Sequence, residues 1–227
     1  SWSRGLGDVY KRQLIENLYI ELLDALNSHF QHTPYLLGGS PCIGDFGLLA
    51  PLYGHLARDP HPAALMKKRA PRVYRWVERM NRASQDAQEY FDCDTDFFQK
   101  NEIPETLIEV LRVLSQDFVP ETIASAKCLN LWLSEQNPTT GSPAVFQLGT
   151  SPLGNVEFQV RDRLIKAAVV PYRHFQLQRI HQIFDEVETK VQIQIKQMLE
   201  SCGMANLLNI RLNRLIGRRD NLEVWLD

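Results

Sequence analysis

Hydrophobic residues recur along the first part of the chain at the spacing of amphipathic helices. In residues 14–30 they return every three or four positions, which places Leu14, Leu18 and Leu22 on one helical face. Pro34 then ends the pattern, because proline cannot donate to the helical hydrogen-bond ladder. The same reasoning predicts helices over about 43–57 and 71–82, and a single helical turn over 63–68.

The second half of the chain predicts further helices and one β-hairpin. A helical pattern starts after Pro104 and continues to about residue 133, and we expect Pro120 to kink or divide it. Short apolar runs at Val145–Leu148 and Val156–Val160 flank glycine-containing turns, which predicts a hairpin. A final helix is predicted from about residue 171 to 200, ended by Cys202-Gly203. The predicted fold class is mainly α: a helical bundle, then a second helical region with a small β-hairpin.

The first 13 residues follow neither the helical nor the strand period. SWSRGLGDVYKRQ lacks the apolar core of a secretory signal and resembles translated adapter sequence. We interpret residues 1–13 as a non-native leader and expect the helix to begin at Leu14. The acidic, irregular stretch over 84–102 is interpreted as a linking arm, which predicts domains at 14–99 and 100–227.

Composition narrows the class of protein but does not specify a function. The formal net charge is −2 and hydrophobic residues make up 44%, so neither nucleic acid nor an anionic membrane surface is an expected partner. No apolar run reaches the roughly 18 residues that span a bilayer. The four cysteines (Cys42, Cys93, Cys128 and Cys202) form no CxxC pair. Scattered cysteines of this kind are typical of free thiols in a reducing compartment, which predicts a cytoplasmic protein.

The sequence predicts no metal site. DCDTDFFQKNEI, residues 92–103, begins like a calcium-binding loop, but Phe97 stands where that loop needs glycine and Ile103 where it needs glutamate. His174 and His181 lie seven positions apart, too far to share a metal without other ligands. We therefore expect a solvated acidic loop and ordinary histidines.

PCIGDFGLLAPLY, residues 41–53, places a carboxylate inside an apolar helical run. If Cys42 flanks the helix, Asp45 is its third residue and reaches back to the Cys42 N–H in a capping box, a structural role worth about 1 kcal/mol. A thiol is a poor acceptor, so Asp45 should carry most of the cap, or Ser40 should help it through a shifted geometry. Pro51 removes the bond to the Gly47 carbonyl and should bend the helix.

PYLLGGSPCIGDFGLLAPLYGHL resembles the signature of the C-terminal helical domain of glutathione transferases, in which Ser/Thr-x-x-Asp opens a central buried helix. LIENLYIELLDALNSHF before it and APRVYRWVERMN after it fit the same domain, so the resemblance covers residues 14 to about 83. One departure is Cys42, which stands where the family has Ser or Thr. Beyond residue 100 the chain resembles the C-terminal extension of some larger family members.

The resemblance implies that the full-length protein conjugates or reduces electrophiles, with glutathione as co-substrate and no cofactor in this chain. In that family glutathione binds mainly to an N-terminal thioredoxin-like domain, which also holds the activating residue. No matching βαβ pattern precedes Leu14, and the first helix of the helical domain also lacks a match. We therefore expect a fragment with an incomplete active site, no catalytic residue and no activity by itself. Its expected partners are the missing thioredoxin-like domain and a second copy in a homodimer.

The resemblance also implies that Leu49 and Tyr53 face the hydrophobic substrate site or the missing domain. The alternative for each residue is simple packing in the core. Where that domain would dock, we expect exposed apolar surface. An alternative function is a non-catalytic helical module for protein interaction or scaffolding.

Overall fold

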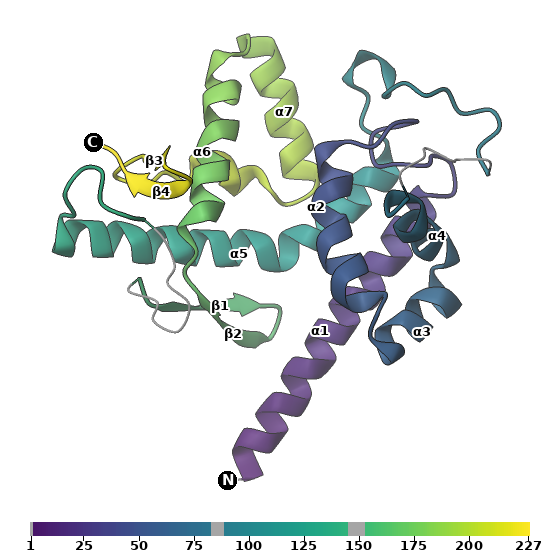
Figure 1. Ribbon diagram of the computed structural model, residues 1–227, viewed down its shortest axis with the longest axis horizontal. Coiled ribbons are helices and arrows are strands. Elements are labelled where there is room, and N and C mark those ends of the chain that lie inside the picture. Colours follow the sequence, from purple (N-terminus) through teal and green to yellow (C-terminus); the bar gives the residue numbers. More distant parts are fainter. Residues whose placement is uncertain (1, 83–88, 145–152) are drawn as a thin grey trace. The chain divides into compact units, whose positions relative to one another are not determined.

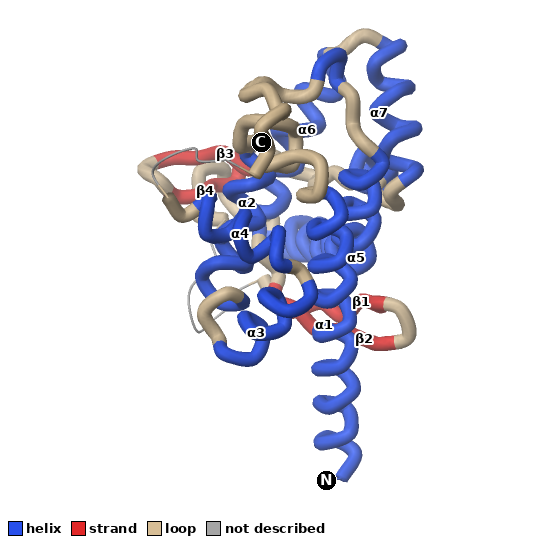
Figure 2. The backbone as a smooth tube through the Cα atoms, turned by 90° about the vertical axis from the view of Figure 1, so that its right-hand side faces the viewer, coloured by secondary structure: helices blue, strands red, loops and turns tan. Residues whose placement is uncertain are grey.

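The computed structural model describes residues 2–82, 89–144 and 153–227, and side chains from residue 12 onward. The chain splits into two compact units, residues 1–113 and 114–227. Helices dominate both units, which confirms the predicted mainly-α class (Figures 1 and 2). Within the described segments, none of the helices has the length and apolar character needed to cross a bilayer.

The first unit is entirely helical apart from its loops. Its elements are α1 (Trp2–His29), α2 (Ile43–Pro51), the π-helical turn η1 (Leu52–Leu56), α3 (Pro60–Arg69), α4 (Pro71–Met80), the 3₁₀ turn η2 (Gln99–Asn101) and the first turns of α5 (Glu105–Gln136). The expected helix start at Leu14 is wrong, because α1 already begins at Trp2. The preceding residues contain no proline, and extending an existing helix adds one hydrogen bond for each residue fixed.

Aromatic stacking forms the centre of this unit. The rings of Phe30, after α1, and Trp76, on α4, stack with centroids 5.3 Å apart, and both side chains are fully buried. Pro60 and Pro71 each occupy the first turn of a helix, where a missing N–H costs nothing. The single turn predicted over 63–68 is therefore wrong. A ten-residue helix, α3, begins at Pro60 instead.

Pro51 changes the pitch of the helix predicted over 43–57. The α-helical part ends at Pro51, and the next turn is π-helical, with the Ala57 N–H donating to the Leu52 carbonyl at 2.7 Å. The wider π-helical turn accommodates Pro51, which has no N–H to donate to the Gly47 carbonyl. The bend expected at Pro51 stays a prediction, and the change from α to π geometry was not predicted.

The second unit combines helices with two β-hairpins. It contains most of α5, β1 (Asn155–Val160), β2 (Arg163–Ala168), α6 (Pro171–Glu186), α7 (Thr189–Ser201), the 3₁₀ turn η3 (Ala205–Asn209), β3 (Ile216–Arg219) and β4 (Leu222–Trp225). Of the two outcomes predicted at Pro120, the division is wrong, because α5 is one helix through that residue, and the kink stays a prediction. Cys202-Gly203 ends α7 as predicted: Gly203 has a φ of 77°, and the Met204 N–H donates to the Leu199 carbonyl at 2.8 Å.

The hairpin prediction is confirmed for one of its two strands. Val156–Val160 lies in β1, which pairs antiparallel with β2 through a turn at Arg161 and Asp162. The predicted partner, Val145–Leu148, lies outside the described residues. A second hairpin, β3–β4, was not predicted, although Asp220 and Asn221 both have the positive φ that a type I′ turn requires.

The long helix predicted over 171–200 is two helices. Val187 leaves the helical region, with φ −79° and ψ 155°, and α7 starts two residues later. The side-chain amide of Gln192 donates to the carbonyls of Phe184 at 3.0 Å and Val187 at 3.2 Å. These two carbonyls at the end of α6 have no helical N–H partner, and the Gln192 amide satisfies them. The free-energy cost of breaking the helix at this position is therefore small.

Two histidines on α6 face the interior of the second unit. His174 is 3% exposed, and its Nε2 lies 3.0 Å from the Ser125 hydroxyl of α5. Burial, helped by nearby Arg173 and His181, lowers the pKa of His174 to about 4. His181 donates from Nε2 to the Leu207 carbonyl at 2.8 Å, and burial also lowers its pKa. Both rings are therefore neutral in the folded protein at neutral pH.

The buried His174 predicts acid-sensitive stability. Between pH 6.5 and about 4 the unfolded chain binds a proton at His174 that the folded chain does not, so the free energy of unfolding falls as pH falls through this window. From pH 7.5 to 4.5 this loss is about 2 to 3 kcal/mol. It should be smaller in His174→Gln, as measured by urea denaturation. His55→Gln, at an exposed position of the first unit, is the control, and an unchanged pH dependence in His174→Gln would contradict the assignment.

Candidate functional site

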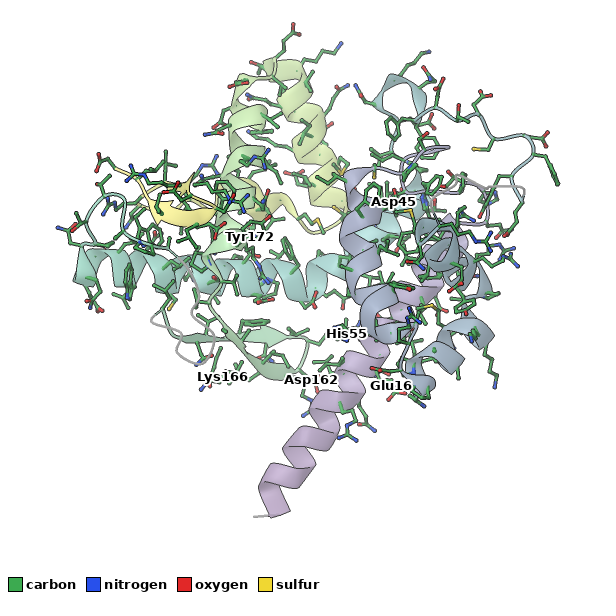
Figure 3. The ribbon with its side chains drawn as sticks, in the orientation of Figure 1. Glu16, Asp45, His55, Asp162, Lys166 and Tyr172 are labelled. Carbon is green, nitrogen blue, oxygen red and sulfur yellow. The ribbon has the colours of Figure 1, made fainter. Side chains whose placement is uncertain are left out.

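Asp45 joins three segments of the first unit. Its carboxylate is fully buried at the start of α2 (Figure 3). Oδ2 accepts from the Cys42 N–H at 2.9 Å, while Oδ1 accepts from the Leu36 N–H at 3.2 Å and from the Trp76 indole N–H at 3.0 Å. A loop, a helix start and α4 thus converge on one side chain. Hydrogen bonds from these three donors replace the water that the buried carboxylate loses, which is consistent with a structural role.

Cys42 is the residue that flanks α2, with extended backbone (φ −104°, ψ 174°). The Asp45 N–H approaches its sulfur, but it also donates to the Cys42 carbonyl at 3.0 Å. Since sulfur is a weak acceptor, the carboxylate side of the capping box is the stronger half. Ser40 does not cap this helix, because its hydroxyl donates to the Thr95 carbonyl instead.

The network continues from Asp45 to α1 and α5. The Leu36 carbonyl accepts from His29 Nε2 at 3.1 Å, and His29 Nδ1 lies 2.9 Å from the Thr106 hydroxyl. A carbonyl only accepts, so the proton is on Nε2 and Thr106 donates to Nδ1. Burial lowers the pKa of His29, which keeps the ring neutral. Every polar atom here has a protein partner, so the network holds elements together and leaves no group directed at a ligand.

The outer face of α2 is apolar and exposed. Asp45 is the one fully buried residue of the helix, whereas Ile43 is 90% exposed and Phe46 is 58% exposed. A Cβ atom added at Gly47 or at Gly54, further along the same segment, would have no neighbouring atom within 4 Å. The expectation of a central buried helix is therefore wrong for α2 in this chain. Its inner side carries the carboxylate, and its outer side presents hydrocarbon to solvent.

Leu49 and Tyr53 lie on the flank between these two sides of α2 and η1. They are four positions apart, and both are half-buried. The Tyr53 hydroxyl accepts from Arg58, whose guanidinium also lies over the Tyr53 ring, 4.5 Å from its centroid. Both side chains therefore adjoin the exposed apolar face, and their role in substrate binding stays a prediction.

Arg79 is a buried cation that the sequence patterns did not single out. It is 5% exposed, donates to the Pro34 carbonyl at 2.7 Å, and lies between the rings of Tyr35 and Tyr90, 5.3 and 5.4 Å from their centroids. Two aromatic faces partly replace the water that the guanidinium loses. Its position three residues after Trp76, on a helix with two other arginines, gives little sequence signal. Arg79 attaches the loop before α2 to α4.

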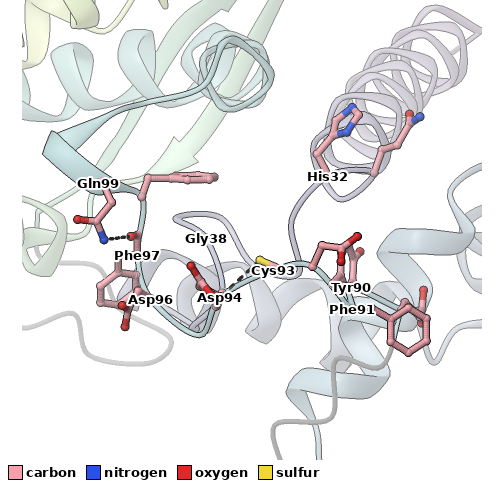
Figure 4. A pocket seen from close by; sticks show the side chains of 14 residues that line it. His32, Gly38, Tyr90, Phe91, Cys93, Asp94, Asp96, Phe97 and Gln99 are labelled. Carbon is pink, nitrogen blue, oxygen red and sulfur yellow. Dashed lines mark hydrogen bonds between the residues drawn. The ribbon is translucent and has the colours of Figure 1, made fainter.

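A groove of about 530 Å³ lies between the loop over 31–39 and the acidic segment over 89–99 (Figure 4). The acidic segment crosses the loop, with the Gly39 N–H donating to the Asp96 carbonyl and the Phe98 N–H to the Leu37 carbonyl, both at 2.9 Å. Asp92, Asp94 and Asp96 are all exposed at its rim. In the described part of the chain, no three His, Cys, Asp or Glu side chains come together as metal ligands. We assign this groove no chemistry.

The Asp45 network predicts a large loss of stability when the carboxylate is removed. Asp45→Ala leaves three buried donors without an acceptor and should lower the free energy of unfolding by about 3 to 6 kcal/mol. Asp45→Asn keeps one acceptor oxygen and should cost about 1 to 3 kcal/mol. Urea denaturation followed by circular dichroism measures both. Glu78→Gln, on the exposed side of α4, should change stability by less than about 0.5 kcal/mol.

The cap also predicts a stabilising substitution. Cys42→Ser supplies a better acceptor for the Asp45 N–H and should raise the free energy of unfolding by about 0.5 to 1 kcal/mol. Cys42→Ala is the comparison, because it removes the sulfur without adding an acceptor. Equal stabilities of the Ser and Ala variants in thermal denaturation would show that the side chain at this position takes no part in the cap.

Comparison with protein families gives a match in the first unit. The model described as "Glutathione S-transferase, C-terminal domain" matches residues 11–79, which include the Asp45 cap, α2, α3 and nearly all of α4. Comparisons with curated proteins and with solved structures give no match. The matched segment confirms the resemblance drawn from the sequence. Residues 11–79 of this chain are therefore similar to the C-terminal domain of glutathione S-transferases.

Proposed function

We propose that this chain is the C-terminal part of a glutathione S-transferase-like protein that conjugates glutathione to electrophiles or reduces them. The match over residues 11–79 supports transferase ancestry in general. The observation that carries the proposal further is the exposed apolar face of α2, formed around Ile43 and Phe46. Burying a side chain of that size is worth about 1.5 to 3 kcal/mol, so a folded domain gains from a partner at this face.

The partner that we propose is a thioredoxin-like domain, which brings the glutathione site. Among the described residues of this chain, no thiol is poised as a nucleophile: burial raises the pKa of the Cys42, Cys93 and Cys128 thiols. Activation of glutathione is therefore assigned to the docked domain. The electrophile would lie beside it, against the half-buried flank formed by Leu49 and Tyr53.

The cysteines support a cytoplasmic location for this protein. None of the four is in a disulfide, although two of them, Cys128 and Cys202, belong to the same folded unit. A reducing compartment keeps such thiols from forming disulfides. We propose the cytoplasm on this ground.

The proposal predicts how two forms of the protein behave on glutathione resin. The 227-residue chain alone should flow through, because the proposal assigns the glutathione site to the docked domain. A protein read from the 5′ end of the message, with an in-frame thioredoxin-like segment, should be retained and eluted by free glutathione. Retention of the 227-residue chain, or a message without such a segment, would contradict the proposal and favour a non-catalytic interaction module.

The docking face can be tested in the longer protein. Phe46→Asp places a charge in the proposed interface and should reduce both retention on the resin and turnover of a chlorodinitrobenzene substrate. Phe91→Asp is the matched control, because Phe91 is 90% exposed and belongs to the acidic segment, not to α2. Equal effects of the two variants would show that α2 has no special part in docking.

A further inference from the structure

The outer face of α6 combines apolar residues with opposite charges on the two sides of Ile183, and we propose that it pairs with α6 of a second copy of this chain. Tyr172, Ile180 and Ile183 are 47%, 56% and 65% exposed on this face. Helical spacing places Arg179 and Glu186 on the same face as Ile183. The opposite face of α6 holds the buried residues His174, Leu177, His181 and Phe184.

The order of the charges makes this face complementary to itself. Arg179 lies four residues before Ile183, and Glu186 lies three residues after it. When two copies of α6 pair antiparallel about a two-fold axis at Ile183, Arg179 of each copy meets Glu186 of the other. A parallel arrangement would instead place like charges together. A symmetric interface of this kind needs one surface only, which favours a second copy over an unrelated partner.

Neighbouring charges on α6 are already paired within the chain. Arg173 lies 2.9 Å from the Glu121 carboxylate, and Asp185 lies 3.8 Å from Arg211. Arg179 differs, because its guanidinium donates to the neutral side chain of Gln176, at 3.3 Å, and not to a carboxylate of the described residues. Arg179 and the exposed Glu186 are therefore the pair of opposite charges that α6 offers to a partner.

The expected association is weak. One face of a 16-residue helix buries less surface than a stable dimer of globular proteins, so we expect a dissociation constant on the order of 100 µM. The two isoleucines contribute apolar burial at the centre, and the two ion pairs set the antiparallel direction. The association should weaken as salt is added, because the ion pairs lie at the solvent-exposed rim.

Sedimentation velocity of the 227-residue chain over a concentration series tests the proposal. The unmodified chain should move from monomer to dimer near the expected constant. Arg179→Glu and Glu186→Arg each place like charges together twice, and each should raise the dissociation constant by about tenfold or more. An equimolar mixture of these two variants should recover association, because every 179–186 contact is then between opposite charges.

Two further variants complete the test. Lys166→Glu, on β2, makes the same change of charge as Arg179→Glu away from α6 and should leave association unchanged. Ile183→Gln removes the apolar centre without changing charge and should also raise the dissociation constant by about tenfold. A chain that stays monomeric at about 1 mM, or single variants that dimerise normally, would overturn the proposal. A mixture that fails to recover would exclude the antiparallel pairing.

Discussion

A single buried carboxylate organises the first unit of this protein. Asp45 accepts hydrogen bonds from a loop, from the start of its own helix and from Trp76 on α4, so it orients three segments at once. Because an unpaired charge is so costly in the interior, these donors cannot separate independently. The position of α2 therefore depends on Asp45 more than on hydrophobic packing. This explains how a helix with one fully buried residue keeps its place.

The same arrangement leaves the rest of α2 available for a partner. In most amphipathic helices the apolar side faces the core and polar residues face water. In α2 the anchor is the buried acid, and Ile43 and Phe46 face solvent. Anchoring through one polar residue leaves the hydrocarbon side of the helix exposed, where we propose that a second domain docks. The inverted pattern is thus the strongest link between the fold of this unit and the proposed transferase function.

Local signals in the sequence were sufficient for most helices and for the position of Asp45, but not for contacts made over long distances in the chain. The Cys42 to Asp45 spacing places a carboxylate at the third residue of α2, whereas its bonds to Leu36 and Trp76 depend on tertiary packing. The break at Val187 was missed because the apolar period continues across it, and a side chain from α7 satisfies the exposed carbonyls. The exposure of α2 could not be predicted, since periodicity identifies an apolar face but not what covers it.

The crossing of the acidic segment over the 31–39 loop restricts how this region can evolve. A methyl group at Gly39 would lie 1.6 Å from the Asp94 carbonyl oxygen, and one at Gly38 would lie 2.7 Å from that of Asp96. Both obstacles are main-chain atoms, which every amino acid possesses. No substitution at positions 94 or 96 can relieve such a collision, so a compensating change would have to alter the length of the crossing segment. Descendants of this sequence are therefore expected to keep the two glycines or to lose the crossing altogether.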